Sequence, residues 1–164
     1  MKEGGSKSRN LFVHARIGSR VNVALPMEFC QEILSWQNPF SLPIQNPMLL
    51  GVIHLRGEIM PILELAGLLN LPSQWEERKH RYQKRKIVVV RQESHLFGLT
   101  VDAVPAILDA QNRRLFKKLD AHCPLSPSMV RGYLKINKQE IYLLNLPALL
   151  QQAILEVGGC RMAG

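Results

Sequence analysis

The residues that most often carry out catalysis or bind metals are few in this chain, and their spacing matches no established site. No two histidines stand in a His-x-x-x-His pattern, and the five are His14, His54, His80, His95 and His122. The cysteines Cys30, Cys123 and Cys160 form no Cys-x-x-Cys motif. A cysteine and a histidine could still meet in space, but Cys30 lies among apolar residues and is more simply a small core residue. An odd number of widely spaced cysteines fits a reducing cytoplasm.

Motifs of the large enzyme classes are also missing. The chain has neither a glycine-rich phosphate loop nor a Gly-x-Ser-x-Gly elbow. No pair of carboxylates stands out against an apolar background as a general acid and base. We therefore expect a protein that is not an enzyme and that uses no cofactor, metal ion or small-molecule substrate.

Positive charge is concentrated in two segments. The formal net charge is +8, and residues 76–86 hold six Lys or Arg against two Glu. A second group consists of Arg113, Arg114, Lys117 and Lys118. Such charge can attract nucleic acid, an anionic lipid surface or an acidic protein, or it can mark a solvated linker. We favour a basic linker at about 72–86, because no ladder of aromatic side chains accompanies the charge.

Short apolar stretches separated by turns predict a mostly β protein. One hairpin is expected from strands 11–17 and 21–25, and another from strands 87–90 and 96–101. Residues 27–34 have a spacing that fits either a helix or a bent strand. These elements must position any functional side chain.

Prolines and aromatic residues mark the connections. Residues 36–47 contain three prolines and predict an ordered loop, which Trp36 and Phe40 are expected to pack. Pro61 is expected at the start of a strand, where a missing N–H donor is tolerable. Residues 66–71 predict a short helical turn.

An internal repeat relates residues 51–65 to residues 132–146. Each copy is a glycine, an apolar strand, a polar turn and a second apolar strand, and the match continues without a gap to a shared Leu-Leu. Residues 103–108 likewise match residues 30–34. The repeat predicts two similar lobes, and short strands at this spacing suggest small closed barrels, which leave no sheet edge exposed.

The two ends of the chain differ from its middle. Residues 1–10 carry positive charge with no apolar stretch behind it, which predicts a flexible tail rather than a secretory signal. The C-terminal segment 151–164 begins as a possible helix over 151–157 and is then expected to become mobile. Apolar residues make up 46% of the chain, enough for a core. No stretch approaches the roughly 20 apolar residues of a membrane span.

Four segments between residues 10 and 150 carry a shared family pattern. Residues 51–65, Gly-Val-Ile-His-Leu-Arg-Gly-Glu-Ile-Met-Pro-Ile-Leu-Glu-Leu, are similar to Gly-Val-Ile-Asn-Leu-Arg-Gly-x-Ile-x-Pro-Ile-x-Asp-Leu. Residues 30–33 look like a Val-x-Glu-Ile/Val element, and 97–104 like Gly-Leu-x-Val-Asp-x-Val. Residues 130–146 look like a closing hairpin. In this order the segments resemble the CheW-like coupling proteins of bacterial chemosensory signalling. His54 and Glu64 depart from the family Asn and Asp.

The resemblance implies a fold and a function. The fold would be two small SH3-like five-stranded β-barrels with short helices, over residues 11–150. The protein would be a cytoplasmic, non-enzymatic adaptor that couples chemoreceptor tips to a CheA-type histidine kinase, with the receptor in a groove between barrels and the kinase regulatory domain at barrel ends. It would reach the inner face of the membrane only through receptor arrays.

The same resemblance implies which residues bind partners. Arg56, beside Gly57, would lie near the receptor groove and close to the partner-facing acid Glu32. The apolar residues of the groove would come from Ile33, Val101 and Val104. Because side chains along a strand alternate between its two faces, only some of the three can face a partner. Each of these could instead be core or a solvated turn, and Asp102 is more simply a residue that holds a turn.

One rival function remains open at this point. The charge of +8 also fits a basic small-barrel protein that binds nucleic acid, whose affinity would fall steeply with salt. Attachment to anionic lipid through the run 76–86 is a third possibility.

Overall fold

The structure, a computed structural model, describes residues 10–18, 20–43, 46, 48–71 and 84–159. Nearly all of the predicted N-terminal tail, most of the predicted basic linker and the last five residues of the C-terminal segment lie outside these ranges. No helix in the described ranges combines the length and the apolar character that crossing a bilayer requires.

The described chain is mostly β, as predicted. Its strands are β1 (Leu11–Ile17), β2 (Val21–Pro26), β3 (Cys30–Ser35), β4 (Leu49–Leu55), β5 (Glu58–Glu64), β6 (Lys86–Gln92), β7 (His95–Val101), β8 (Ala103–Asp109), β9 (Val130–Ile136) and β10 (Gln139–Leu144). The helices are α1 (Leu65–Leu68) and α2 (Leu146–Gly159), and 3-10 turns at Met27–Phe29 and Pro127–Met129 precede β3 and β9.

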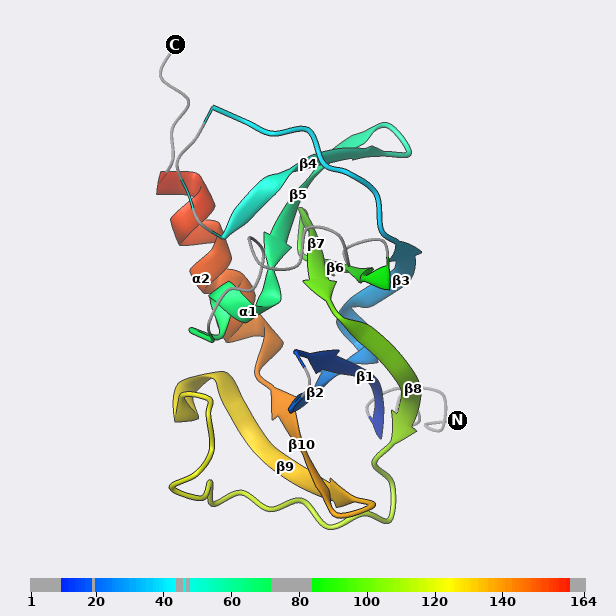
Figure 1. Ribbon diagram of the computed structural model, residues 1–164, viewed down its shortest axis with the longest axis vertical. Helices are drawn as coiled ribbons and strands as arrows, with labels where there is room; N and C mark the ends of the chain where they lie inside the picture. The colour runs from blue at the N-terminus through cyan, green and yellow to red at the C-terminus, as the bar shows by residue number, and fades with distance from the viewer. Residues whose placement is uncertain (1–9, 19, 44–45, 47, 72–83, 160–164) are drawn as a thin grey trace.

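The strands form two five-stranded sheets, one in each lobe. Lobe A has the order β8-β1-β2-β10-β9, and lobe B has the order β3-β6-β7-β5-β4. Lobe B lies at the top of Figure 1 and lobe A at the bottom, with α2 along the left side. Phe40 bridges to Val52 on β4, and Phe116 bridges to Tyr133 on β9. In lobe B the segment after β3 therefore pairs with β4, and in lobe A the segment after β8 pairs with β9. In each lobe this pairing joins the two edges of the sheet and curls it into a small barrel.

The two halves of the repeat interlock rather than forming one lobe each. The first half gives β1 and β2 to lobe A, and then β3, β4 and β5 to lobe B; the second half does the reverse with β6 to β10. The halves join through two parallel pairs, in which Asn22 on β2 lies opposite Ile141 on β10 and Ile62 on β5 lies opposite Gly98 on β7. The crossing strands β3 and β8 link the lobes.

Apolar packing forms a small core inside each lobe and a larger core between them. The core of lobe B contains Ile53, Met60 and Ile62, and the core of lobe A contains Leu134 and Ile141. The largest cluster draws on both sheets and on the two helices. Strand β6 explains why the run 87–90 is apolar without interruption. Its side chains alternate between the lobe B core and the shared core, so both of its faces are buried.

The structure explains why each copy of the repeat begins with glycine. Gly51 and Gly132 have φ angles of +145° and +152°, which L-residues rarely adopt. A Cβ on Gly132 would lie 2.6 Å from the carbonyl oxygen of Phe116, and a Cβ on Gly51 would overlap the carbonyl oxygen of Phe40 in the same way. The repeat glycines therefore let the closing segment approach β4 and β9.

Several expectations from sequence change in the structure. Residues 27–34 are neither one helix nor one strand, because the 3-10 turn Met27–Phe29 leads into β3. Pro61 lies in the middle of β5, just before the pairing of β5 with β7 starts at Ile62. It therefore removes no hydrogen bond from that ladder, which makes its mid-strand position tolerable. Helix α2 begins at Leu146, and its residues Leu146, Leu149, Leu150 and Ala153 are buried in the shared core.

The basic linker ends earlier than predicted. Lys86 already belongs to β6, and Arg85 is buried with 6% exposure. These two cations are therefore part of the fold rather than of a solvated linker. The part of the linker over residues 72–83 lies outside the described ranges.

Candidate partner-binding site

Glu32 and Arg56 form a two-pronged ion pair across lobe B. Glu32 comes from β3, and Arg56 lies in the turn between β4 and β5. The Nη1 atom of Arg56 lies 2.8 Å from Oε1 of Glu32, and Nη2 donates to Oε2 at 2.9 Å. The Arg56 side chain is still 75% exposed, while that of Glu32 is 23% exposed. The carboxylate orients the guanidinium and leaves its outer surface open to another group.

The turn that carries Arg56 requires unusual backbone angles. Arg56 has a φ of +48° and Gly57 a φ of +84°, so both central residues of the hairpin are left-handed. A Cβ on Gly57 would meet nothing within 4 Å. Glycine is therefore favoured here by backbone conformation, and a partner contact at Gly57 stays a prediction.

The predicted apolar residues divide between surface and core. Ile33 on β3 is 39% exposed. Val104 on β8 is half-buried and packs partly against the shared core. Val101 at the end of β7 has no exposed surface. Val101 therefore does not line a partner surface. It is a core residue, because both faces of its strand are covered.

Ile107 was not among the predicted site residues, although the repeat points to it. It lies on β8 at the position that matches Ile33 on β3, and it is 48% exposed. Figure 1 shows both crossing strands on the side of the molecule away from α2. The match between residues 30–34 and 103–108 was the available signal. We define the crossing-strand surface as Ile33, Val104 and Ile107.

The ion pair and the crossing-strand surface are distinct features. Along β3, Gln31, Ile33 and Ser35 are exposed, whereas Cys30, Glu32 and Leu34 are half-buried. Neighbouring strand residues point to opposite faces. Glu32 and Ile33 therefore point apart, and the structure brings together Glu32 and Arg56 but not Glu32 and Ile33.

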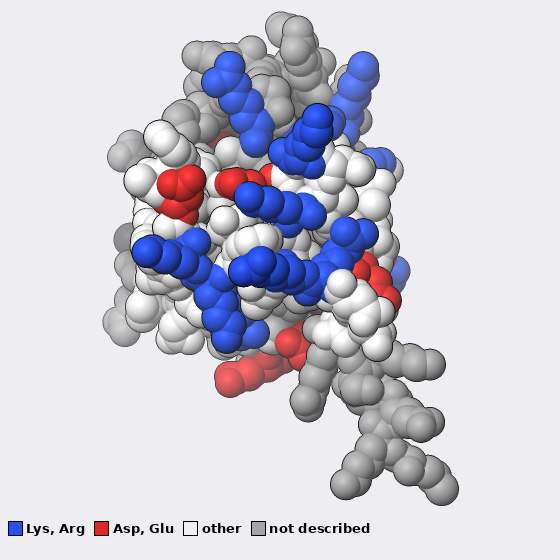
Figure 2. Space-filling view, turned by 90° about the horizontal axis from the view of Figure 1, so that it is seen from below, with Lys and Arg blue, Asp and Glu red and all other residues white. Residues whose placement is uncertain are grey.

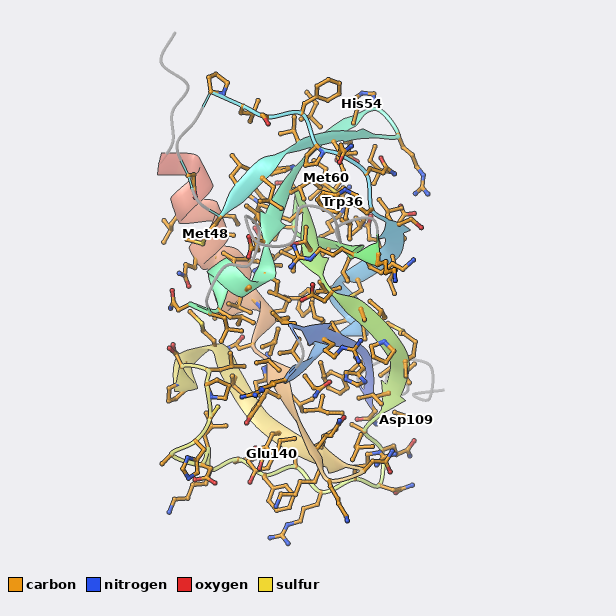
Figure 3. All side chains as sticks on the ribbon, in the orientation of Figure 1. Trp36, Met48, His54, Met60, Asp109 and Glu140 are labelled. Carbon is orange, nitrogen blue, oxygen red and sulfur yellow. The ribbon has the colours of Figure 1, made fainter. Side chains whose placement is uncertain are left out.

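A second exposed apolar surface lies on the outer face of the hairpin β4–β5. The sheet register places Val52 opposite Pro61 and His54 opposite Ile59, and Phe40 bridges to Val52. Phe40 is 78% exposed and Ile59 is 70% exposed. The ring of Phe40 therefore does not pack the loop 36–47 as predicted, whereas Trp36 does pack against the lobe B core. Figure 3 shows His54 at the end of lobe B that is farthest from lobe A. We call Phe40, Val52, His54, Ile59 and Pro61 the lobe B outer face.

Asp102 acts as a structural residue, as predicted. Its Oδ1 accepts a hydrogen bond from Nε of Arg85 at 2.9 Å, and its Oδ2 accepts one from the backbone N–H of Gly18. Its own backbone N–H donates to the carbonyl of Arg16 at 2.9 Å. These bonds tie the junction between β7 and β8 to the β1–β2 turn and to the start of β6, and so join the two lobes.

The thiol of Cys30 is partly buried and has a structural role. Cys30 donates to the carbonyl oxygen of Pro26 at 3.5 Å, and burial raises the pKa of its thiol to about 12. A neutral thiol is a poor nucleophile and metal ligand. Within the described ranges no three His, Cys, Asp or Glu side chains are placed to hold a metal ion.

Comparison with known proteins identifies the family. The CheW-like domain matches residues 11–153. The chain is 31% identical over 131 residues to a probable chemotaxis protein CheW of Rhizobium etli, covering 76% of this chain and 81% of that protein. It is 30% identical over 146 residues to a chemotaxis protein CheW of Rhizobium meliloti, covering 84% and 91%.

A solved structure supports the same assignment at the level of the fold. The scaffolding protein TtCheW of Thermoanaerobacter tengcongensis superposes with a TM-score of 0.73 over 91% of this chain and 92% of that one, at 17% sequence identity. The two five-stranded sheets are thus those of the CheW fold, with its two SH3-like lobes. The chain belongs to the CheW-like domain family.

Proposed function

We propose that this protein is a non-enzymatic adaptor that joins chemoreceptor tips to a CheA-type histidine kinase in the cytoplasm. The observation that carries the proposal is the presence of two separate exposed apolar surfaces on one fold, the crossing-strand surface and the lobe B outer face. An adaptor needs two such surfaces, since it must hold two partners at once. The relatives named as chemotaxis proteins set the biological context.

The crossing-strand surface is the proposed receptor site. Ile33 and Ile107 expose 39% and 48% of their surface on two strands that link the lobes, and Val104 on β8 is half-buried. A helical hairpin presents apolar side chains every three or four residues, which suits a surface made by two strands. We leave Val101 out of this site because it is buried.

Arg56 is proposed as a second, polar contact with the receptor, separate from the crossing-strand surface because Glu32 and Ile33 point to opposite faces of β3. Its guanidinium has five N–H donors, and the two contacts to Glu32 leave others free to meet a carboxylate on a partner helix. Glu32 then serves chiefly to orient Arg56. An exposed pair of this kind contributes at most about 1 kcal/mol to stability, so its main value lies in orientation.

The lobe B outer face is the proposed contact for the kinase regulatory domain. Phe40 and Ile59 are more exposed than any other large apolar side chains in the described ranges. Large, exposed aromatic and aliphatic groups on a rigid sheet are typical anchors of protein interfaces. A pocket between this face, β7 and α2, lined by Ile59, Pro61, Leu96 and Ile154 among others, extends the surface.

A charge swap tests whether Arg56 contacts the receptor. Binding of a receptor-tip fragment is measured for the wild type, Arg56→Glu, and the double variant Glu32→Arg with Arg56→Glu. The single reversal should weaken binding about tenfold or more, because a desolvated charged contact is lost. The double variant rebuilds an internal pair but places the opposite charge toward the partner, so it should stay weak. Recovery in the double variant would mean that Arg56 serves only the fold.

A second pair of variants separates the two surfaces. Ile107→Ser should weaken receptor binding and leave binding of the kinase regulatory domain unchanged, while Phe40→Ser should do the opposite. Leu155→Ser, at a site on α2 with 68% exposure, is the matched control and should change neither. Wild-type protein that bound neither fragment would rule out the adaptor function.

A further inference from the structure

Positive charge in the described chain gathers at the end of lobe A that lies farthest from lobe B (Figure 1). Residues 110–138 contain seven Lys or Arg against a single Asp, whereas the rest of the described chain holds seven Lys or Arg against nine Asp or Glu. Figure 2, which views lobe A from below, shows that Lys and Arg outnumber Asp and Glu across this face. We define the basic end as the seven cations of this segment, all of them exposed: Arg113, Arg114, Lys117, Lys118, Arg131, Lys135 and Lys138.

The cations of the basic end are not neutralised within the described structure. None of the seven forms an ion pair with another described residue, whereas three arginines elsewhere each have a carboxylate partner. Two of the seven lie against an aromatic ring instead. The guanidinium carbon of Arg114 lies 4.8 Å from the ring centroid of Phe116, and Nζ of Lys135 lies 5.2 Å from the same centroid. These contacts hold two like charges close together without neutralising either of them.

The backbone that carries the basic end is fixed to the sheet of lobe A. The backbone N–H groups of Phe116 and Tyr133 each donate to the carbonyl oxygen of the other residue at 2.9 Å, and their rings stack with centroids 5.0 Å apart. Lys138 lies in the tight turn between β9 and β10, where Asn137 and Lys138 have φ angles of +51° and +65°. The cations are therefore held together on a folded surface. A partner that presents many anions would relieve their mutual repulsion.

The composition of the basic end favours an anionic lipid surface over a nucleic acid. The ring of Phe116 is occupied by Tyr133 and two cations, so it offers no open platform on which a base could stack. Leu115, between Arg114 and Phe116, is 38% exposed. An apolar side chain gains nothing against a row of nucleic-acid phosphates. At a bilayer it can enter the interfacial layer while the neighbouring cations meet lipid phosphates.

We propose that the basic end is a peripheral contact for an anionic phospholipid bilayer, in which the seven cations face lipid phosphates and Leu115 reaches below them. The family resemblance gives the membrane only an indirect role, through receptors. The basic end adds a direct and salt-sensitive contact, which raises the local concentration of the free protein at the bilayer. The inference goes beyond the adaptor function and does not depend on it.

The test measures cosedimentation of the full chain with phosphatidylcholine vesicles that contain about 30% phosphatidylglycerol, which gives the surface a negative potential. Binding is measured at about 50 and 300 mM NaCl, and vesicles of phosphatidylcholine alone give the background. The test variant is Arg113→Glu with Arg114→Glu. The matched control is Arg16→Glu with Arg20→Glu, which changes the net charge equally at exposed sites outside residues 110–138. Thermal unfolding shows whether each variant keeps its fold.

The inference predicts that the wild type binds anionic vesicles at least about tenfold more tightly at low salt than at high salt, and that phosphatidylcholine alone binds little. The test variant should lose at least about tenfold in affinity at low salt, and the control less than about threefold. No binding of the wild type to anionic vesicles would overturn the inference. Vesicle binding that the test variant retains, or an equal loss in both variants, would overturn it as well, because cations elsewhere would then carry the effect.

Leu115→Ser separates a bilayer from a nucleic acid as the partner. It should weaken binding to anionic vesicles about threefold or more, because apolar burial is lost. Leu155→Ser, at a site on α2 with 68% exposure, is its control and should have no effect. Vesicle binding unchanged in Leu115→Ser would overturn the lipid assignment. Binding of a duplex of about 20 base pairs that the test variant abolishes would then assign the basic end to nucleic acid. None of these measurements involves a receptor or a kinase, so their failure leaves the adaptor function standing.

Discussion

Nε of Arg85 donates a hydrogen bond to Oδ1 of Asp102 over 2.9 Å, with side-chain exposures of only 7% and 17%. The two residues are 17 positions apart, and Arg85 lies just before β6 while Asp102 lies just after β7. Asp102 also accepts from the backbone of Gly18 in lobe A. This one carboxylate therefore connects the lobes, and its loss should affect both of them.

Asp102→Ala should lower the free energy of unfolding by about 3 kcal/mol, because it leaves a buried guanidinium without this partner. Urea denaturation measures the change. Arg91→Ala breaks the more exposed pair with Glu58 and should cost less than about 1 kcal/mol. Similar costs for the two variants would show that Asp102 does not hold the lobes together.

The repeat glycines should resist substitution more than the turn glycine does. Gly51→Ala and Gly132→Ala each combine a strained φ with a Cβ that overlaps a carbonyl oxygen, so each should cost at least about 2 kcal/mol. Gly57→Ala meets a strained φ in open space and should cost about 1 kcal/mol. Thermal unfolding ranks the three variants by their loss of stability. If Gly51→Ala cost no more than Gly57→Ala, the close approach of the Phe40 segment to β4 would not be needed to close the barrel.

Cys30 should make stability depend on alkaline pH. In the unfolded chain its thiol ionises near the ordinary pKa of 9.0, while burial raises the folded pKa to about 12. The folded state thus keeps a proton that the unfolded state releases, so stability falls as pH rises above 9, by up to about 1.4 kcal/mol per unit. The reference is Cys30→Ala, which should show a shallower fall between pH 9 and 10. Equal slopes would show that Cys30 is solvated.

Helix α2 should behave as part of the core rather than as a tail. Leu150 is completely buried in the shared core, and Leu150→Ala should cost about 2–4 kcal/mol through the cavity that it leaves. Leu155→Ala on the same helix should cost less than about 0.5 kcal/mol, since Leu155 is 68% exposed. Denaturant titration measures the free energy of unfolding of both variants. If Leu150→Ala left it unchanged, α2 would not be part of the folded core.

The local pattern of the chain predicted most strands and both repeat hairpins, because alternation and turn residues act over a few positions. The bent element at 27–34 was ambiguous, since only its pairing with β6 selects the strand from Cys30 onward. The start of α2 was placed too late because Leu146 reads equally well as the end of a strand. Pairing partners far along the chain decide such cases.

The candidate site was predictable only in part. The resemblance placed Glu32 near Arg56, and the structure brings them together. The resemblance does not say which side chains are exposed, so Val101 was predicted together with Ile33 as a groove residue. In the structure Val101 is buried, because both faces of β7 are covered. Ile107 could have been found from its repeat position. The lobe B outer face depends on which side chains reach the surface, such as Phe40 and Ile59, and sequence spacing does not report that.

The interlocked halves also constrain how the protein folds as it is made. Asn22 on β2 pairs with Ile141 on β10, 119 residues later. On the ribosome the first hairpin emerges long before the strand that completes its sheet, and lobe B also has to await β6 and β7. Contacts of such high sequence separation slow folding. We therefore expect native structure to appear late in synthesis, with the nascent first half exposing unpaired strand edges until the second half arrives.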